Sequence, residues 1–140
     1  MHFISTRGEE KVTGAQAIVQ GIAKNGGLFV PETFPTVTRE ELEAMGEMSY
    51  PERAAFILGK YLADELGAEY LLESCEKAYS TFTGDDPVPL VKVDGETGLY
   101  VLELYRGPTC SIKDIAVTLL PYLLNFPFWC CIRTHTHIYA

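Results

Sequence analysis

Residues 102–114 read LELYRGPTCSIKD, and this stretch decides how the fold is interpreted. It predicts a strand that runs into a loop containing Gly107 and Pro108, followed by a helix that begins near Ser111 or Ile112. Lys113 would then lie in the first turn of the helix, where free N–H groups and a partial positive charge favour a neutral amine. A neutral amine forms a Schiff base with an aldehyde, so Lys113 is the candidate catalytic residue. The same position suits an ordinary solvated lysine, and spacing alone does not separate the two.

Three of the helices expected upstream are marked by capping boxes in the sequence. In each box a Ser or Thr side chain accepts from the N–H three residues later, and a Gln or Glu there reciprocates. The pairs are Thr13 with Gln16, Thr38 with Glu41, and Ser49 with Glu52. The first helix is expected to end at Asn25-Gly26-Gly27 and the second at Gly46, since glycine accepts the helix C-cap conformation.

Apolar periodicity predicts how the remaining elements pack. Residues 54–62 and 71–82 each carry one apolar helical stripe, so these two helices should pack together. Short strands are expected at Phe3–Thr6 and Leu28–Val30. Val88–Val93 and Leu99–Leu104 predict a hairpin. The helix after Lys113 should bend or loosen at Pro121.

Composition bounds the kind of protein. The 140 residues are 47% hydrophobic and 21% charged, which indicates one globular domain with a core. A net charge of −8 argues against nucleic acid as a partner. No long apolar stretch opens the chain, so we expect a cytoplasmic protein with reduced cysteines. Residues 115–132 are mostly apolar, but Pro121, Asn125 and Pro127 argue against a membrane span.

The cysteines and the last residues give no metal site. Residues 125–140 differ from the rest, and no acidic residue follows Asp114. The candidate ligands of this tail are Cys130, Cys131, His135 and His137. Their spacing matches no common zinc pattern, so no metal is predicted. Cys110, three residues before Lys113, is expected to be a small buried hydrophobe rather than a nucleophile.

An ordered set of segments resembles the threonine synthases. LELYRGPTCSIKDIA, residues 102–116, is similar to the segment of that family that carries the lysine for pyridoxal 5′-phosphate (PLP). Its usual form is a Leu-Glu-Leu strand, an aromatic residue, His-Gly-Pro-Thr, and Phe-Lys-Asp at a helix start. STRG at 5–8, QAI at 16–18, GIA at 21–23 and GGLFVPE at 26–32 resemble the family's opening, and Ser49-Tyr50 and Ala78-Tyr79 fit as well. The resemblance spans roughly Phe3 to Leu124, with Arg106 in place of the usual histidine and Ile112 in place of phenylalanine.

The resemblance implies a fold and an activity. The fold is α/β: the N-terminal domain of a PLP enzyme of fold type II (tryptophan-synthase-β-like), with helices around a small sheet. Lys113 would bind PLP as a Schiff base and move protons between carbons of O-phospho-L-homoserine, while phosphate leaves and water adds to give L-threonine. Such an enzyme is a PLP-dependent carbon–oxygen lyase acting on a phosphate. The related threonine synthase-like phospholyases, which eliminate phosphate without making threonine, are the alternative.

The resemblance also predicts how the chain divides. A threonine synthase N-terminal domain would cover residues 1–124, and residues 125–140 would form a divergent tail outside the fold. In the family, the glycine-rich loop that holds the PLP phosphate follows the lysine helix, so we expect a chain truncated after that helix, with little or no activity alone. A non-catalytic truncated product or an interaction module is the third interpretation. Apolar surface on Ile115–Leu123 predicts self-association.

Overall fold

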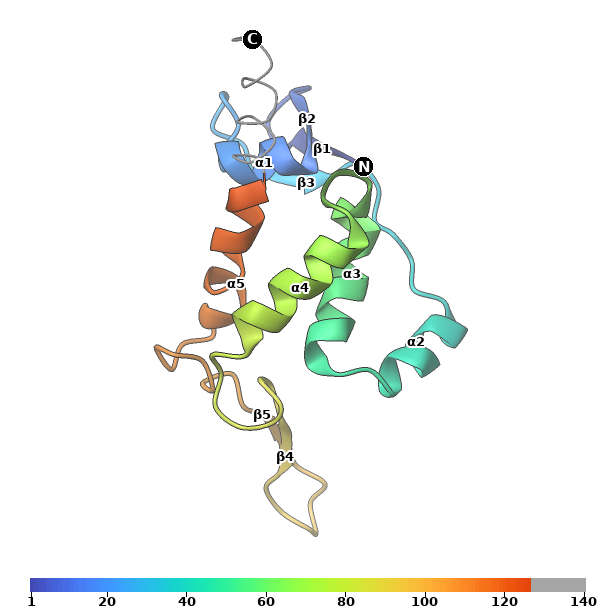
Figure 1. Ribbon diagram of the computed structural model, residues 1–140, viewed down its shortest axis with the longest axis vertical. Helices are drawn as coiled ribbons and strands as arrows, with labels where there is room; N and C mark the ends of the chain where they lie inside the picture. Colours follow the sequence, from blue (N-terminus) through green and yellow to red (C-terminus); the bar gives the residue numbers. More distant parts are fainter. Residues whose placement is uncertain (127–140) are drawn as a thin grey trace, which may run out of the picture.

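A three-stranded antiparallel sheet stands at one end of the molecule (Figure 1). The structure is a computed structural model and describes residues 1–126. The strands are β1 (His2–Ser5), β2 (Lys11–Thr13) and β3 (Phe29–Pro31), in the order β2-β1-β3. Phe3 of the central strand pairs with Val12 on one side and with Pro31 on the other. Pro31 is tolerated because β3 is an edge strand, where a missing N–H leaves the ladder intact.

Three of the four helices before Lys113 begin where the capping boxes predict. The four helices are α1 (Gly14–Gln20), α2 (Arg39–Gly46), α3 (Tyr50–Leu66) and α4 (Ala68–Tyr79). In the first three helices both reciprocal hydrogen bonds of the box are present. An N-cap of this kind stabilises a helix by about 1 kcal/mol. The expected starts of these three helices and the end at Gly46 are therefore confirmed.

The expected end of the first helix was wrong. α1 ends at Gln20, and Gly21 follows with φ 72°, a conformation that glycine adopts readily. The carboxylate of Glu10 then accepts from the backbone N–H of Lys24 at 2.9 Å and from Nε2 of Gln20 at 3.0 Å. These bonds hold the chain after Gly21 in a turn, whereas the sequence pattern suggested continued helix. Asn25 closes that turn, since its Oδ1 accepts from the N–H of Gly27 at 3.0 Å.

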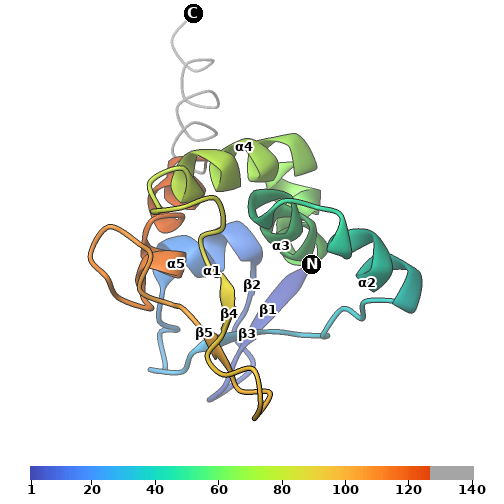
Figure 2. The ribbon, with the colours of Figure 1, turned by 90° about the horizontal axis from the view of Figure 1, so that it is seen from below.

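The core lies between α3, α4 and the last helical residues, and Phe3 of the sheet packs against it. Its buried members are Leu62, Leu66, Leu71, Cys75, Ala78, Tyr79, Phe82, Leu119 and Leu123. Leu71 and Cys75 are completely buried. The packing of the two apolar stripes is thus confirmed. α3 and α4 lie side by side in both views, with α2 on the side of α3 away from α5 (Asp114–Val117) (Figures 1 and 2).

The hairpin is present but shorter than expected. β4 (Leu90–Lys92) pairs antiparallel with β5 (Tyr100–Leu102), and Val91 faces Val101. Figure 1 shows it projecting from the end of the molecule opposite the three-stranded sheet. All six of its residues are exposed, so the hairpin contributes little to the core.

The last helical part is interrupted, as Pro121 predicted. α5 (Asp114–Val117) is followed by a turn at residues 118–119, and the chain is helical again over 120–126. Proline has no N–H to donate to the carbonyl of Val117, four residues earlier, so a continuous helix would lose a bond here. The N–H of Tyr122 instead donates to the carbonyl of Leu119 at 3.0 Å.

The sequence analysis made predictions about a membrane span, the division of the chain and the composition of the tail. Within residues 1–126, no helix combines the length and apolar character needed to cross a membrane. The proposed division of the chain at residue 124 remains a prediction. The cysteines and histidines of the tail lie outside the described residues.

Candidate functional site

Lys113 lies at the surface, immediately before α5. Its backbone has φ −63° and ψ −23°, its N–H donates to Ser111 Oγ at 3.3 Å, and its carbonyl accepts from the N–H of Val117 at 2.8 Å. Within residues 1–126 its amine makes no ion pair, whereas Lys11, Lys60 and Lys77 pair with glutamates. The backbone of Lys113 is therefore fixed while its amine stays exposed to solvent.

Lys113 does not lie in the first turn of a helix, as the sequence predicted. The helix begins at Asp114 and has four residues, so Lys113 is its N-cap rather than part of its first turn. The preceding turns are tighter than α-helix, because the N–H of Asp114 donates to the carbonyl of Ser111 at 3.0 Å, three residues back. So short a helix gives little positive field at its start. The loop before Lys113, not a helix dipole, sets its position.

The carboxylate of Asp114 holds that loop from within. The Asp114 residue is 4% exposed. Its Oδ2 accepts from the N–H of Thr109 at 2.8 Å and, at a longer 3.4 Å, from the N–H of Ser111. Its Oδ1 accepts from the Thr109 hydroxyl at 2.6 Å. The hydroxyl of Thr109 is the main cause that holds the pKa of Asp114 below its usual range, and it outweighs the opposing effect of burial. Asp114 is therefore ionised at neutral pH.

Gly107 completes this arrangement through close contact. A Cβ on Gly107 would lie 2.4 Å from Cβ of Asp114 and 2.5 Å from its Oδ2. Carbon atoms in contact normally stay about 3.5–4.0 Å apart, so only glycine fits here. The Gly-Pro pair that drew attention to this loop is thus explained in part by the space that Asp114 needs.

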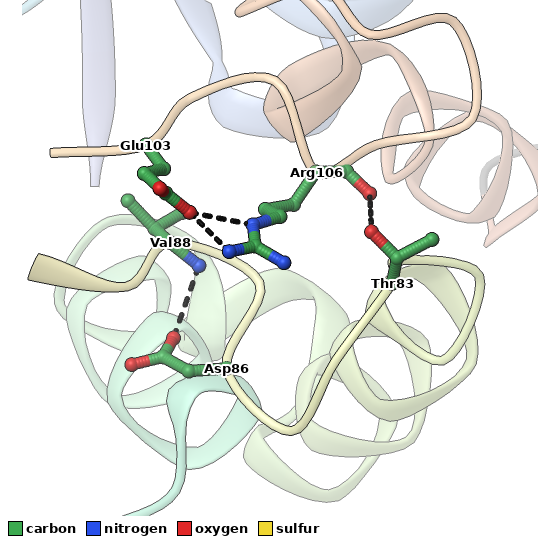
Figure 3. Close-up of polar contacts among 5 residues, drawn as sticks. All are labelled: Thr83, Asp86, Val88, Glu103 and Arg106. Atoms are coloured by element: carbon green, nitrogen blue, oxygen red, sulfur yellow. Dashed lines mark hydrogen bonds and ion pairs between the residues drawn. The ribbon is translucent and has the colours of Figure 1, made fainter. Parts of the chain in front are cut away.

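A second anchor holds the beginning of the loop (Figure 3). The N–H and the hydroxyl of Thr83 both donate to the carbonyl of Arg106, at 3.0 and 3.2 Å. The Arg106 guanidinium forms an ion pair with Glu103, with Nε 2.7 Å from Oε2. This hydrogen bond raises the pKa of Arg106 and lowers that of Glu103. The arginine that replaces the family's usual histidine is therefore bound within the loop.

The chain after Lys113 is tied to the core. The hydroxyl of Tyr79, on α4, donates to the carbonyl of Ile115 at 3.2 Å. Burial raises the pKa of Tyr79, so the hydroxyl stays protonated and remains a donor. The Thr118 hydroxyl donates to the carbonyl of Asp114 at 2.6 Å. Lys113 is thus held on both sides by contacts that reach buried groups.

The expectation for Cys110 was wrong, because this residue is exposed. Its φ of 56° is the one positive value at a non-glycine position among the described residues. In this turn, the N–H of Cys110 donates to the carbonyl of Gly107 at 3.0 Å, and the backbone carries the thiol away from the core. Residues 1–126 contain no group of three His, Cys, Asp or Glu side chains placed to hold a metal.

Sequence reasoning found Lys113 but missed the residues that hold its loop. Asp114 and Thr109 could have been noticed, because an acid and a hydroxyl five residues apart can close a loop by hydrogen bonding. Tyr79 was assigned to an apolar stripe and to the family resemblance, and its hydroxyl bond depends on the tertiary structure. Thr83 gave no signal in the sequence.

Comparisons with known proteins show which family this chain resembles. The family model described as the threonine synthase N terminus matches residues 2–79, more than half of the chain. Threonine synthase from Schizosaccharomyces pombe is 35% identical over 126 residues, which cover 89% of this chain and 24% of the relative. Threonine synthase-like 1 from Homo sapiens is 34% identical over 133 residues, 86% of this chain and 18% of the relative.

A solved structure gives the same result at the level of the fold. The crystal structure of PLP-bound threonine synthase from Brucella melitensis has a TM-score of 0.83 and 35% identity to this chain. The match covers 90% of this chain and 27% of the other. The chain spans about a quarter of the length of the threonine synthases that it matches. The α/β fold expected from the resemblance is confirmed, and the chain belongs to the threonine synthase N-terminal family.

Proposed function

We propose that this chain supplies the PLP-lysine part of a threonine synthase, and that Lys113 binds the aldehyde of PLP. Support for the cofactor comes from the Brucella melitensis relative, whose structure was solved with PLP bound. The observation that carries the proposal is the combination at Lys113 of a fixed backbone and an exposed amine without an ion pair in residues 1–126. The proposed substrate is O-phospho-L-homoserine, and the proposed product is L-threonine.

The residues present fit the aldehyde end of the cofactor. An accessible primary amine is the group that an aldehyde requires, and Lys113 offers one next to a loop fixed by Asp114 and Thr83. When bound, PLP supplies an electron sink for charge that develops on the substrate carbons. The part proposed for Lys113 is to hold the aldehyde and, as a free amine, to carry a proton at Nζ between substrate carbons.

Borohydride trapping tests the assignment of Lys113. The chain is incubated with PLP, reduced, digested and mapped by mass spectrometry. Lys24 and Lys92 serve as internal controls, because both are exposed and neither has an ion pair within residues 1–126. We expect the pyridoxyl group on Lys113 in preference to both. Lys113→Ala should abolish the preferred adduct, and Lys92→Ala should leave it unchanged. Equal labelling of the three lysines would count against the proposal.

A complementation experiment tests the reaction. The 140-residue chain alone should release no phosphate from O-phospho-L-homoserine, because its lysine is open to solvent rather than enclosed in a site. Co-expression with the remaining three quarters of the Schizosaccharomyces pombe enzyme should restore growth of a threonine auxotroph. Lack of growth with wild-type Lys113, where both polypeptides are present and folded, would contradict the proposed activity.

Phosphate elimination without threonine formation, which the resemblance to threonine synthase-like phospholyases implies, is the second candidate, and the chain is 34% identical to threonine synthase-like 1 from Homo sapiens. Product analysis on the complemented pair separates the two. Threonine and phosphate in equal amounts support a threonine synthase, and phosphate without threonine supports a phospholyase.

Self-association through residues 115–123 remains a prediction. Val117 and Leu120 are 56% and 41% exposed, so this segment presents apolar surface. Light scattering over a concentration series should show a mass above that of one chain. A constant monomer mass would refute the expectation.

A further inference from the structure

Asp114 stands next to Lys113 in the chain, but its side chain does not face solvent with the lysine amine. Both carboxylate oxygens are turned into the preceding loop, where they accept from the N–H of Thr109, its hydroxyl, and the N–H of Ser111. One buried side chain thus organises the five residues before it. Three donors therefore meet at this one carboxylate: two backbone N–H groups and one hydroxyl.

We propose that Asp114 is the positioning residue of the lysine site: it fixes the 107–111 loop and thereby sets where Lys113 presents its amine to the aldehyde of PLP. The inference rests on the proposed function of Lys113. It adds that the lysine depends on an acid that touches neither cofactor nor substrate, because the carboxylate is occupied by the loop.

The chemistry of the contacts favours a carboxylate over any neutral side chain. Oδ2 accepts from two backbone N–H groups, so an amide nitrogen there would place its own N–H groups against those donors. Oδ1 takes the Thr109 hydroxyl, which an asparagine oxygen could also do. Asp114→Asn preserves size but removes the charge. With its nitrogen at the Oδ2 position the bonds to the backbone are lost, and with its oxygen there they persist only as weaker neutral bonds.

Close packing links the position of the Asp114 carboxylate to that of the Lys113 backbone. Gly107 leaves no space beside Cβ of Asp114, so the carboxylate cannot shift without moving the loop backbone. On the other side, the carbonyls of Asp114 and Ile115 are held by Thr118 and Tyr79. Lys113 lies between the loop that Asp114 holds and the carbonyls that Thr118 and Tyr79 hold. If the loop is no longer held by Asp114, the backbone of Lys113 is fixed only on its C-terminal side.

The test compares wild type, Asp114→Asn and a matched control in the 140-residue chain. The control is Glu65→Gln, since Glu65 also accepts two backbone N–H groups, from Gly14 at 2.8 Å and Ala15 at 3.1 Å, far along the chain from the loop. Two quantities are measured: amide hydrogen exchange at Thr109 and Ser111, and the borohydride-trapped adduct on Lys113 relative to Lys24 and Lys92. The ratio within one chain corrects for differences in PLP concentration and in overall reactivity.

We expect Asp114→Asn to speed exchange at both loop amides and to lower the Lys113 ratio roughly tenfold, since misplacement of a reacting group by about 1 Å can cost up to about a hundredfold. Glu65→Gln should lower the urea midpoint and leave the ratio unchanged. Thr109→Val removes only the hydroxyl donor and should shift the ratio in the same direction by less. It replaces Asp114→Asn if that variant does not fold.

Three results separate the possibilities. If Asp114→Asn speeds loop exchange but keeps the Lys113 ratio within about twofold of wild type, Asp114 is structural only and the inference fails. If Glu65→Gln lowers the ratio as much, general stability is the cause and the inference also fails. If wild-type Lys113 shows no preference over the control lysines, the proposed function itself is refuted, independently of Asp114.

Discussion

Gly107→Ala should destabilise the protein through a single steric contact. The new Cβ would lie 2.4 Å from Cβ of Asp114, 2.5 Å from Oδ2 and 2.8 Å from Cγ. Since carbon atoms in contact keep about 3.5 Å apart, the loop or the aspartate must move by about 1 Å. Such a shift would lengthen the 2.8 Å bond between the N–H of Thr109 and Asp114.

The expected magnitude follows from the cost of overpacking. One extra methyl group in a tightly packed place typically costs about 1–3 kcal/mol. Glycine to alanine also restricts the unfolded chain, which stabilises by about 0.4–1 kcal/mol wherever the folded backbone permits alanine. Gly95→Ala is the matched control, because no heavy atom lies within 4 Å of its Cβ position and its φ is not positive. The difference between the two variants isolates the steric cost.

Urea denaturation followed by circular dichroism measures that difference. With a slope of about 2 kcal/mol per molar urea, a cost of about 2 kcal/mol lowers the midpoint of Gly107→Ala by about 1 M relative to Gly95→Ala. Equal midpoints for the two variants would show that the loop yields without cost, and that Asp114 and Gly107 are not packed as described.

Three further predictions concern the core, the acid range and the cysteines. Leu71→Ala should lower the free energy of unfolding by about 2–5 kcal/mol, because Leu71 is completely buried, and an unchanged urea midpoint would contradict this. The pKa values of Asp114 and Glu65 are lower in the folded state than in the unfolded state. Their ionised forms therefore stabilise the fold fully above the unfolded-state pKa values of about 4, and this stabilisation is lost as the pH falls through the folded-state pKa values. Urea midpoints measured from pH 6 downward should therefore fall in wild type below about pH 4 and fall less in Asp114→Asn, and parallel curves would refute this role. Burial, the main cause, raises the pKa of Cys75 to about 11, so iodoacetamide at pH 8 should modify exposed Cys110 and leave Cys75 protected until urea is added, as peptide mapping would show. Rapid modification of both thiols in the folded protein would contradict the buried position of Cys75.

The features that the sequence predicted are mostly local. The capping boxes at Thr13, Thr38 and Ser49 involve residues three apart, so their chemistry does not depend on the rest of the fold. The break near Pro121 has the same origin, since proline lacks a donor wherever it stands. The packing of α3 on α4 follows from two apolar stripes joined by one residue, Gly67.

The features that were missed depend on residues far apart or on backbone conformation. α1 stops early partly because Glu10 binds Gln20 and the backbone of Lys24, which no helical pattern reveals. β2 has three residues and forms by pairing with β1, so its own sequence carries little signal. The exposure of Cys110 follows from a positive φ in a turn.

The candidate site also contains one residue that the sequence revealed and several contacts that only the structure shows. Lys113 was found because its neighbours resemble a known segment, and its candidacy required no coordinates. The contact of Asp114 with Thr109 was not found, because it requires the loop to turn back on itself. The contact of Thr83 with Arg106 joins residues 23 apart and was equally hidden.

Three side-chain contacts from α4 and its end have a consequence for the order of folding. The Tyr70 hydroxyl donates to the carbonyl of Tyr122, Tyr79 to Ile115, and Thr83 to Arg106, across separations of 52, 36 and 23 residues. Contacts at such separations carry the entropy cost of closing a long loop, whereas α3 and α4 are neighbours in the chain.

The pair of helices should therefore form first and act as a template for the segment that carries Lys113. Pulse-labelled hydrogen exchange during refolding should show protection in α3 and α4 before the Thr109 amide, and simultaneous protection would contradict this order. During synthesis the template is complete before Lys113 is added, because α4 ends at Tyr79. The segment that carries Lys113 would thus acquire its position after this pair of helices, on a surface that is already folded.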